Sequence, residues 1–194
     1  MYMQELKERI VKEGKVLPGN IIKVDGFLNH RIDTELLGHI AEEFGKYFNM
    51  DEVTMILTAE ASGIALATAV ASRFHKPMIF AKKAKSDNIE GGLYQSDIYS
   101  YTYKKKVTLL VSKEWLSSDD KVLVIDDFMA NGEAMRGLCD IVTAAGATLV
   151  GIGCAVEKGF QGGGDRLRAA GVNLKSLAII ESAEPGHIVF RDDD

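Results

Sequence analysis

The sequence predicts an α/β fold in which helices flank a central parallel sheet. Short apolar runs rich in β-branched residues recur along the chain, and most of them lead into a segment with helical periodicity. Strands that alternate with helices favour a parallel sheet with right-handed crossovers. The 194 residues, 46% of them hydrophobic, are enough for one domain with a substantial core.

The N-terminal elements precede this alternation. Residues 2–13 mix apolar and charged side chains at helical spacing, which predicts an amphipathic helix. A Pro-Gly-Asn break follows; residues 21–24 are then expected to be extended and residues 25–33 to form a polar loop. Asp33 is expected to cap a helix that runs through about Tyr47.

The strand–helix repeat accounts for most of the remaining chain. Each expected strand is a short apolar run, and each expected helix follows a small or polar residue that can begin it. Strands are expected at 53–58, 77–81, 122–125, 147–156 and 174–180, and helices at 62–74, 132–145 and 164–170.

A long insertion separates the second of these strands from the third. Residues 82–94 are polar and rich in glycine, and residues 98–103 and 107–112 have the pattern of a β-hairpin. A long irregular insertion in a compact domain is typical of a lid or of a disordered segment. We therefore expect a single domain over 1–194 with a lid over about 84–106.

Composition excludes several classes of protein. The net charge of −5 disfavours broad nucleic-acid binding, and no apolar run is long enough to span a membrane. The charged N-terminus does not have the pattern of a secretory signal. Cys139 and Cys154 lie in apolar patterns, which predicts buried reduced thiols. A cytoplasmic protein is expected.

Two adjacent carboxylates, Asp126 and Asp127, follow the strand expected at 122–125. Such groups are costly to bury unpaired, and open α/β sheets bind ligands at the carboxyl ends of their strands. The loop after them begins the next helix, so its backbone N–H groups can bind an anion. Its residues are Ala130, Asn131, Gly132, Glu133 and Ala134. Acids beside an anion site predict that a sugar phosphate binds here.

Two further strand ends carry groups suited to a second anion. Ser62 is a good helix N-cap and Gly63 allows a close approach of the backbone, which suits a pyrophosphate; an ordinary capped helix is the alternative. Lys82 and Lys83 could neutralise phosphate charge, or they could form a solvated basic turn.

Lys158 and Phe160 follow the strand expected at 147–156. An ammonium that donates to a carbonyl oxygen and a ring that stacks would fit a planar, oxo-bearing ligand. An ordinary core role for Phe160 is the alternative. Because the carboxyl ends of parallel strands meet at one edge of a sheet, we expect all of these segments to form one site.

Five segments resemble a known family. They are KVDGFLNHRID (23–33), TAEASGI (58–64), FAKKAKS (80–86), VLVIDDFMANGEA (122–134) and GIGCAVEKGFQGG (151–163). The fourth resembles the signature of the type I phosphoribosyltransferases. Together, over nearly the whole chain, the five resemble the bacterial xanthine branch of the type I purine phosphoribosyltransferases.

The resemblance implies a fold and a reaction. The fold would carry a small hood, from about 14–32 plus the C-terminal segment, and a flexible β-hairpin lid. The reaction would transfer the 5-phosphoribosyl group from phosphoribosyl pyrophosphate to N9 of xanthine, giving xanthosine 5′-monophosphate and pyrophosphate in purine salvage. Mg²⁺ would be held mainly by phosphoribosyl pyrophosphate, with no assigned protein ligand. A homodimer is also implied.

The resemblance also assigns roles to residues. The loop at 130–134 would bind the 5′-phosphate, and Asp126 and Asp127 would bind the ribose hydroxyls. The pyrophosphate would contact Ser62, Gly63, Lys82 and Lys83. The purine would contact Ile22, Asn29, Lys158 and Phe160, with Asn29 donating to O2 and Lys158 to O6.

Two positions depart from the family pattern. Many members carry Gly or Thr where Glu133 stands, so we expect its backbone N–H to bind the phosphate while its side chain faces solvent. Many carry a hydroxyl near Ala134. Thr is also common where Asn131 stands, and Asn131 is expected to cap the helix.

Two alternatives remain open at the level of the sequence. An amide side chain can flip and offer its oxygen, so Asn29 does not exclude guanine or hypoxanthine as the base. A non-catalytic regulator that senses phosphoribosyl pyrophosphate would keep the same fold. Such regulators usually carry a DNA-binding domain and a basic surface, and the acidic charge balance argues against one.

Overall fold

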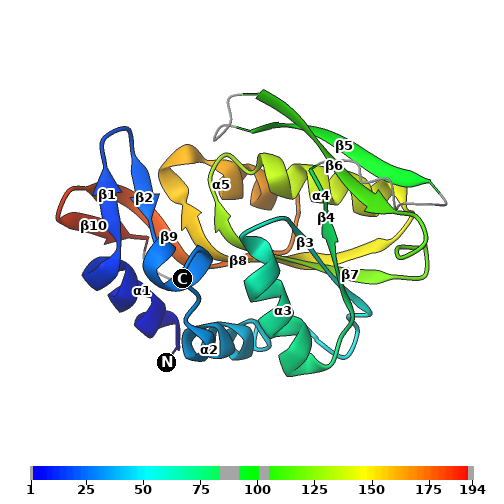
Figure 1. Cartoon of the computed structure of the whole chain (residues 1–194), viewed down its shortest axis with the longest axis horizontal. Coiled ribbons are helices and arrows are strands. Elements are labelled where there is room, and N and C mark those ends of the chain that lie inside the picture. Colours follow the sequence, from blue (N-terminus) through cyan, green and yellow to red (C-terminus); the bar gives the residue numbers. More distant parts are fainter. Residues whose placement is uncertain (1, 84–91, 101–104, 192–194) are drawn as a thin grey trace.

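The computed structural model describes residues 2–83, 92–100 and 105–191 of the chain. Its centre is a six-stranded sheet in the order β10-β9-β8-β7-β3-β4 (Figure 1). The five strands from β9 to β4 pair in parallel, which confirms the predicted parallel sheet, whereas β10 pairs antiparallel with β9. Their bounds are β3 Met55–Ala59, β4 Met78–Ala81, β7 Lys121–Met129, β8 Thr148–Lys158, β9 Leu174–Glu184 and β10 His187–Phe190.

The sheet therefore departs from the prediction at one edge. β10 was not expected, and it makes the sheet mixed instead of wholly parallel. A tight turn with Gly186 at φ 81° reverses the chain between β9 and β10. An antiparallel edge strand needs only such a turn, and its half-buried residues lack the long apolar run that marks a central strand.

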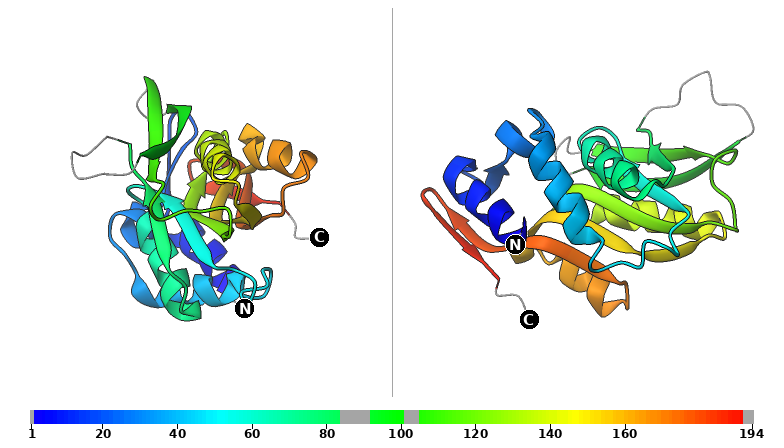
Figure 2. Two further views of the ribbon diagram at one scale, coloured as in Figure 1. Left: turned by 90° about the vertical axis from the view of Figure 1, so that its right-hand side faces the viewer. Right: turned by 90° about the horizontal axis from the view of Figure 1, so that it is seen from below.

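Helices cover both faces of the sheet. The first three pack on one face and the fourth packs on the other (Figures 1 and 2). The alternation along β7 explains this arrangement, because Leu123 and Ile125 face one layer while Val122 and Val124 face the other. The helices are α1 Tyr2–Glu13, α2 Thr34–Phe44, α3 Gly63–Phe74, α4 Glu133–Ala144 and the short α5 Gly163–Ala169.

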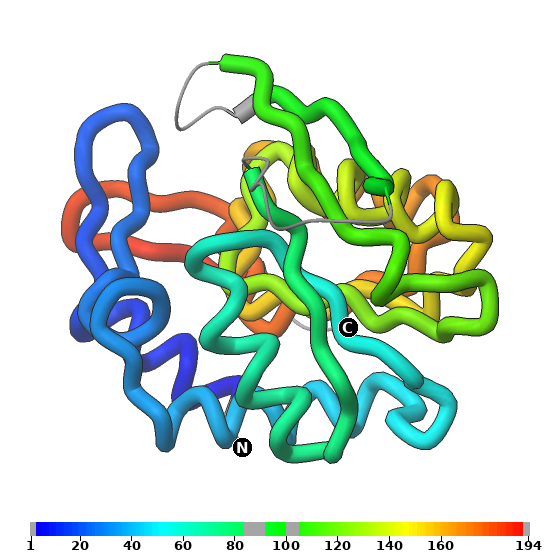
Figure 3. Tube along the Cα trace, turned by 45° about the vertical axis from the view of Figure 1, so that its right-hand side comes forward, coloured from blue at the N-terminus to red at the C-terminus, as the bar shows by residue number. Residues whose placement is uncertain are grey.

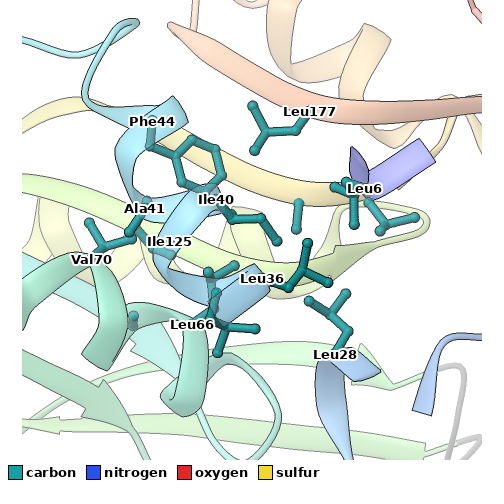
Figure 4. Close-up of a cluster of buried hydrophobic side chains, with 14 of the residues drawn as sticks. Leu6, Leu28, Leu36, Ile40, Ala41, Phe44, Leu66, Val70, Ile125 and Leu177 are labelled. Carbon is teal, nitrogen blue, oxygen red and sulfur yellow. The ribbon is translucent and has the colours of Figure 1, made fainter. Parts of the chain in front are cut away.

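The larger core lies between α1, α2, α3 and the sheet. Figure 4 shows Leu36, Ile40 and Phe44 of α2 directed toward Ile125 and Leu177 of the strands. These side chains are at most 1% exposed. This apolar contact fixes α2, and through it the segment just before α2, against the strand that carries the two aspartates.

Residues 25–29 correct the prediction of a polar loop. They form a single π-helical turn, η1 Asp25–Asn29, in which Phe27 and Leu28 are fully buried. The predicted cap after it is confirmed, since the Asp33 side chain accepts a hydrogen bond from the N–H of Leu36 at 3.2 Å. The α2 helix ends at Phe44 instead of continuing to Tyr47.

The expected hood region contains a small hairpin. β1 Lys15–Leu17, which was not expected, pairs antiparallel with β2 Ile21–Lys23. This hairpin stands at one end of the molecule, and the β5–β6 hairpin stands at the other end on the same side (Figure 3). The hood assignment itself stays a prediction.

The inserted hairpin is confirmed with different bounds. β5 Leu93–Ser100 pairs with β6 Lys105–Ser112 along its whole length. Ile98 and Leu109 are buried, and they approach Gly137 of α4 so closely that a side chain there would collide with them. These strands are thus part of the packed body. The rest of the expected lid, 84–91 and 101–104, lies outside the described residues.

The prediction of buried thiols is confirmed for Cys154, whereas Cys139 is only partly buried. Cys139 and Cys154 are free thiols, and Cys154 is completely buried. Burial, with a smaller effect from the charge of Asp140, raises the pKa of the Cys139 thiol to about 11. Among the helices of the described ranges, none is long and apolar enough to cross a membrane.

Candidate active site

The two aspartates lie inside a strand, which corrects the expectation that they follow one. β7 continues through Met129, with Asp126 opposite Cys154 and Met129 opposite Glu157 of β8. The pairing with β8 keeps this polar stretch extended. The carboxylates are consequently held on a rigid element, and both are buried, with 7% of Asp126 and 1% of Asp127 exposed.

Asp127 connects three parts of the chain. Its Oδ1 accepts a hydrogen bond from Ser62 Oγ at 2.9 Å, and its Oδ2 accepts one from Asn29 Nδ2 at 2.9 Å. Three residues that the sequence assigned to the pyrophosphate, the ribose and the base are therefore in direct contact. Ser62 stands at the first position before α3, but its side chain does not cap the helix as expected. The hydroxyl donates to Asp127 instead.

Asp126 has a different environment. Its Oδ1 accepts a hydrogen bond from the backbone N–H of Asp127 at 3.1 Å. Burial, and next the charge of Asp127, raise the pKa of the Asp126 carboxyl well above its ordinary value. Gly63 packs against this carboxylate and the Thr58 hydroxyl, leaving no room for a Cβ atom. A glycine is therefore required where the chain crosses Asp126.

The loop 130–134 leads into α4 as predicted, but the helix cap differs. The residue before α4 is Gly132 at φ 77°, and no side chain caps the helix, so the expected capping role of Asn131 is wrong. Gly163 of α5 packs against the backbone of this loop, with no space for a side chain. Arg166 Nη2 donates to the carbonyl oxygen of Asn131 at 3.0 Å. The first N–H groups of α4 have no acceptor within the helix, so they are available to an anion.

The Glu133 side chain is partly exposed and is held by two neighbours. Its carboxylate accepts hydrogen bonds from the backbone N–H of Tyr99 at 3.3 Å and from Arg136 Nη2 at 3.2 Å. The hydrogen bond from Arg136 is the main cause of a lowered pKa at Glu133. The negative charge that seemed incompatible with a bound phosphate is thus neutralised by an arginine one turn along the same helix.

The two lysines after β4 point to different places. Lys83 lines a cavity of about 310 Å³ together with Glu60, Ala61, Lys105 and Val107. Lys82 instead lines an apolar groove that includes Phe80 and Trp115. The presence of Lys105 in the cavity that Lys83 lines was not predicted.

The residues expected at the purine come from two parts of the chain, the N-terminal segment that contains Ile22 and the end of β8 at Lys158. Lys158 Nζ donates to the carbonyl oxygen of Asn20 at 2.9 Å and lies 5.4 Å from the centre of the Phe128 ring. Burial lowers the pKa of Lys158. Ile22 is buried, with 7% of it exposed. Phe160, in the short helix η2 Gly159–Gln161, packs against the larger core, so the core alternative describes its position.

Sequence reasoning missed three residues near these loops. Arg166, on α5, contacts the loop before α4, and Lys105, on β6, lines the same cavity as Lys83. Both elements are distant in the chain from the segments that they contact. Phe128 directly follows the two aspartates, so its position in the motif could have indicated that its ring lies near them. The neighbouring Glu157 is fully buried and is paired with Arg168 of α5.

The acidic side chains do not by themselves build a metal centre. In the part of the chain that the structure covers, no cluster of three or more His, Cys, Asp or Glu side chains could hold a metal ion. Two adjacent carboxylates are the arrangement expected when a cation such as Mg²⁺ is held chiefly by substrate oxygens and water.

Comparison with known proteins identifies the family. A phosphoribosyl transferase domain model matches residues 28–172. The xanthine phosphoribosyltransferase of Lachnoclostridium phytofermentans is 52% identical, over 98% of this chain and all of that protein. The enzyme of the same name from Ruminiclostridium cellulolyticum is 50% identical, over 98% of this chain and all of that protein.

Solved structures agree at the level of the fold. Adenine phosphoribosyltransferase from Giardia lamblia, in complex with 9-deazaadenine, superposes with a TM-score of 0.76 at 20% identity, covering 91% of this chain and 97% of that one. The enzyme from Saccharomyces cerevisiae superposes with a TM-score of 0.73 at 17% identity, covering 91% and 98% of the two chains. The fold is that of the type I phosphoribosyltransferases, and the chain belongs to the phosphoribosyltransferase family.

Proposed function

We propose that the protein is a xanthine phosphoribosyltransferase of purine salvage. It transfers the 5-phosphoribosyl group of phosphoribosyl pyrophosphate to N9 of xanthine and releases pyrophosphate. The contact of Asp127 with both Ser62 and Asn29 is the observation that carries this proposal. It brings the groups proposed for the leaving group, the sugar and the base to one point. The names of relatives about 50% identical over the whole chain support the choice of xanthine.

The sugar phosphate binds at the start of α4. The 5′-phosphate accepts hydrogen bonds from backbone N–H groups of the loop 130–134, where the dipole of the 12-residue helix also favours an anion. Asp126 and Asp127 accept hydrogen bonds from the ribose hydroxyls. Their burial in a rigid strand fixes the sugar relative to the other two loops.

The pyrophosphate lies over the start of α3. Ser62 and Gly63 provide the close backbone approach, and Lys83 and Lys105 provide positive charge on the cavity wall. Lys82 contributes only if its side chain turns away from the apolar groove that it lines. Mg²⁺ would be held mainly by the oxygens of phosphoribosyl pyrophosphate and would neutralise further charge on the leaving group.

The chemistry requires positioning more than covalent assistance. The bond from C1′ to the pyrophosphate oxygen breaks, its electron pair leaves with pyrophosphate, and N9 of the purine forms the new bond to C1′. The lysines and N–H groups stabilise the departing charge, and the aspartates hold the sugar in line. Exclusion of water prevents hydrolysis of the activated sugar.

The purine binds between the hood and the end of β8. Lys158 donates to O6 and Asn29 donates to O2, while Ile22 provides an apolar contact. Phe160 offers only part of its ring for stacking on the purine, because the ring also packs against the core. Phe128, whose ring lies under the Lys158 ammonium, is a second aromatic face at this position.

The assembly and location also belong to the proposal. A cytoplasmic homodimer is consistent with an apolar groove beside β4, near which Trp115 is 61% exposed and Phe80 is 37% exposed. Light scattering coupled to size-exclusion chromatography tests the dimer, and a monomer at micromolar concentration would contradict it.

One assay separates this function from the alternatives. The purified protein is incubated with phosphoribosyl pyrophosphate, Mg²⁺ and xanthine, guanine or hypoxanthine, and nucleotide formation is followed by absorbance. Xanthine should have the highest kcat/KM. A higher value for guanine or hypoxanthine would assign the protein to that specificity instead. No nucleotide from any base, together with binding of phosphoribosyl pyrophosphate, would indicate the non-catalytic regulator.

A further inference from the structure

Asp127 and Asn29 form the contact from which a second role for Asp127 can be inferred. Asn29 Nδ2 donates to Asp127 Oδ2 at 2.9 Å, and Ser62 Oγ donates to the other oxygen at 2.9 Å. With 1% of Asp127 exposed, water does not compete freely for this carboxylate. Within the described ranges no lysine or arginine forms an ion pair with it. The Ser62 hydroxyl and the Asn29 amide are the side-chain donors to Asp127 within these ranges.

The partner of an amide side chain decides which way the amide faces. An asparagine presents N–H donors at one end and an oxygen acceptor at the other, and the two ends have nearly the same shape. A carboxylate only accepts, so the nitrogen end of Asn29 must face Asp127. A flipped amide would set its oxygen against a buried carboxylate oxygen, and Asp127 would lose the hydrogen bond from Asn29.

The contact leaves part of Asn29 available to a ligand. One N–H of the amide is used by Asp127, and the second N–H and the carbonyl oxygen remain. A carboxylate has about four acceptor positions, so Asp127 can also bind a ribose hydroxyl without releasing Asn29. Asn29 is half-buried in the single turn η1, which the buried Phe27 and Leu28 anchor. The orientation is thus set before a base arrives.

We propose that Asp127 is a positioning residue for base recognition, because it fixes the amide orientation with which Asn29 distinguishes an oxo group from an amino group at C2 of the purine. This rests on the proposed function, in which Asn29 faces C2. In the proposed placement of the base, the free N–H of Asn29, and not its carbonyl oxygen, faces C2 and meets the O2 of xanthine. The 2-amino group of guanine would bring donor against donor. The flip that would accommodate guanine is opposed by Asp127.

The test measures base discrimination and compares it across variants. For the wild type, Asp127→Asn, Asn29→Ala and the double variant, kcat/KM is determined for xanthine and for guanine with saturating phosphoribosyl pyrophosphate and Mg²⁺. Loss of a ribose contact slows both bases equally, so the ratio of the two values isolates recognition at C2. The new amide in Asp127→Asn can pair with either orientation of Asn29.

We expect Asp127→Asn to lower the xanthine-to-guanine ratio by at least about tenfold. Asn29→Ala should lower it similarly, and the double variant should fall no further, because both changes remove the same constraint. A ratio in Asp127→Asn within about twofold of the wild type would overturn the proposal. Where turnover is too slow, the ratio of Kd values for xanthosine and guanosine monophosphates, measured by calorimetry, provides the same comparison.

Ser62→Ala is the matched control. It removes the other donor to Asp127 but leaves the Asn29 contact, so the ratio should stay near that of the wild type. An equal loss of discrimination in Ser62→Ala would point to a general disturbance of the site and would also overturn the proposal. Failure of the wild type to use xanthine would instead reject the proposed function, so the two failures are distinguishable.

Discussion

Two buried acidic centres on neighbouring strands are neutralised in different ways. On β8, Glu157 accepts hydrogen bonds from both terminal nitrogens of Arg168, at 3.1 and 2.6 Å, and from the Ser176 hydroxyl. On β7, Asp126 and Asp127 are also buried, but their hydrogen bonds come from a hydroxyl, an amide and a backbone N–H. One centre is paired with a cation and the other is bonded to neutral donors.

The difference separates a structural charge from a functional one. A buried carboxylate is tolerated when a bidentate guanidinium satisfies it, and Glu157 in this way attaches α5 to the sheet. The paired aspartates keep unused acceptor positions, and burial together with the charge of Asp127 raises the pKa of Asp126. Such a group is suited to accept the hydroxyls of a ligand. The four predictions below test this contrast.

The largest effect is expected from Arg168→Ala. Glu157 is completely buried, so removal of its guanidinium leaves an uncompensated charge and should lower the free energy of unfolding by about 3 kcal/mol. Urea denaturation at pH 7 measures the change. Arg166→Ala is the control on the same helix, since this exposed side chain bonds only carbonyl oxygens. Equal unfolding midpoints for the two variants would contradict the structural role of the Glu157 pair.

Gly63→Ala should damage the functional centre without affecting the structural one. The added methyl collides with the Thr58 hydroxyl and the Asp126 carboxylate, and overpacking of this kind costs about 1–3 kcal/mol. We expect kcat/KM for phosphoribosyl pyrophosphate to fall by at least about tenfold. Gly38→Ala is the control, because a Cβ there meets nothing within 4 Å. Normal kinetics in Gly63→Ala would mean that the loop does not need this close approach.

Asp126→Asn should stabilise the ligand-free protein while reducing its activity. Burial and the charge of Asp127 raise the folded-state pKa of Asp126 above its ordinary value, so the unfolded chain releases this proton first as the pH rises. The wild type therefore loses stability between the unfolded and the folded pKa, and the variant does not. The Tm of the variant should match the wild type near pH 4 and exceed it at pH 8, by about 2–4 °C for each kcal/mol of stabilisation. If the Tm difference between the variant and the wild type is the same at pH 4 and at pH 8, the pKa of Asp126 is not raised.

The smallest effect is expected from Arg166→Ala. Its guanidinium holds the carbonyl oxygen of Asn131 at 3.0 Å on the outside of the phosphate loop. Loss of one hydrogen bond from an exposed charged group should weaken binding of phosphoribosyl pyrophosphate by about 1 kcal/mol, which is roughly fivefold in KM. Steady-state kinetics with varied phosphoribosyl pyrophosphate measures it. An unchanged KM would show that the loop keeps its shape without this arginine.

The sequence alone accounted for the local features of this molecule. Apart from β1 and β10, the order of strands and helices follows from periodicity and from residue type over a few neighbours, as do the Asp33 cap and the free cysteines. The signature at 122–134 also sufficed to locate the candidate site at the carboxyl edge of the sheet, because the topology of parallel strands leaves few other places for it.

Features that depend on distant partners were decided only by the tertiary structure. β7 continues through its two aspartates because β8 pairs with it, and no local propensity requires this. Ser62 and Asn29 are 65 and 98 residues away from Asp127 in sequence, yet they are its partners. A buried carboxylate takes the donors that the packed fold brings to it, so the partner of each acid depends on three-dimensional proximity and not on sequence spacing.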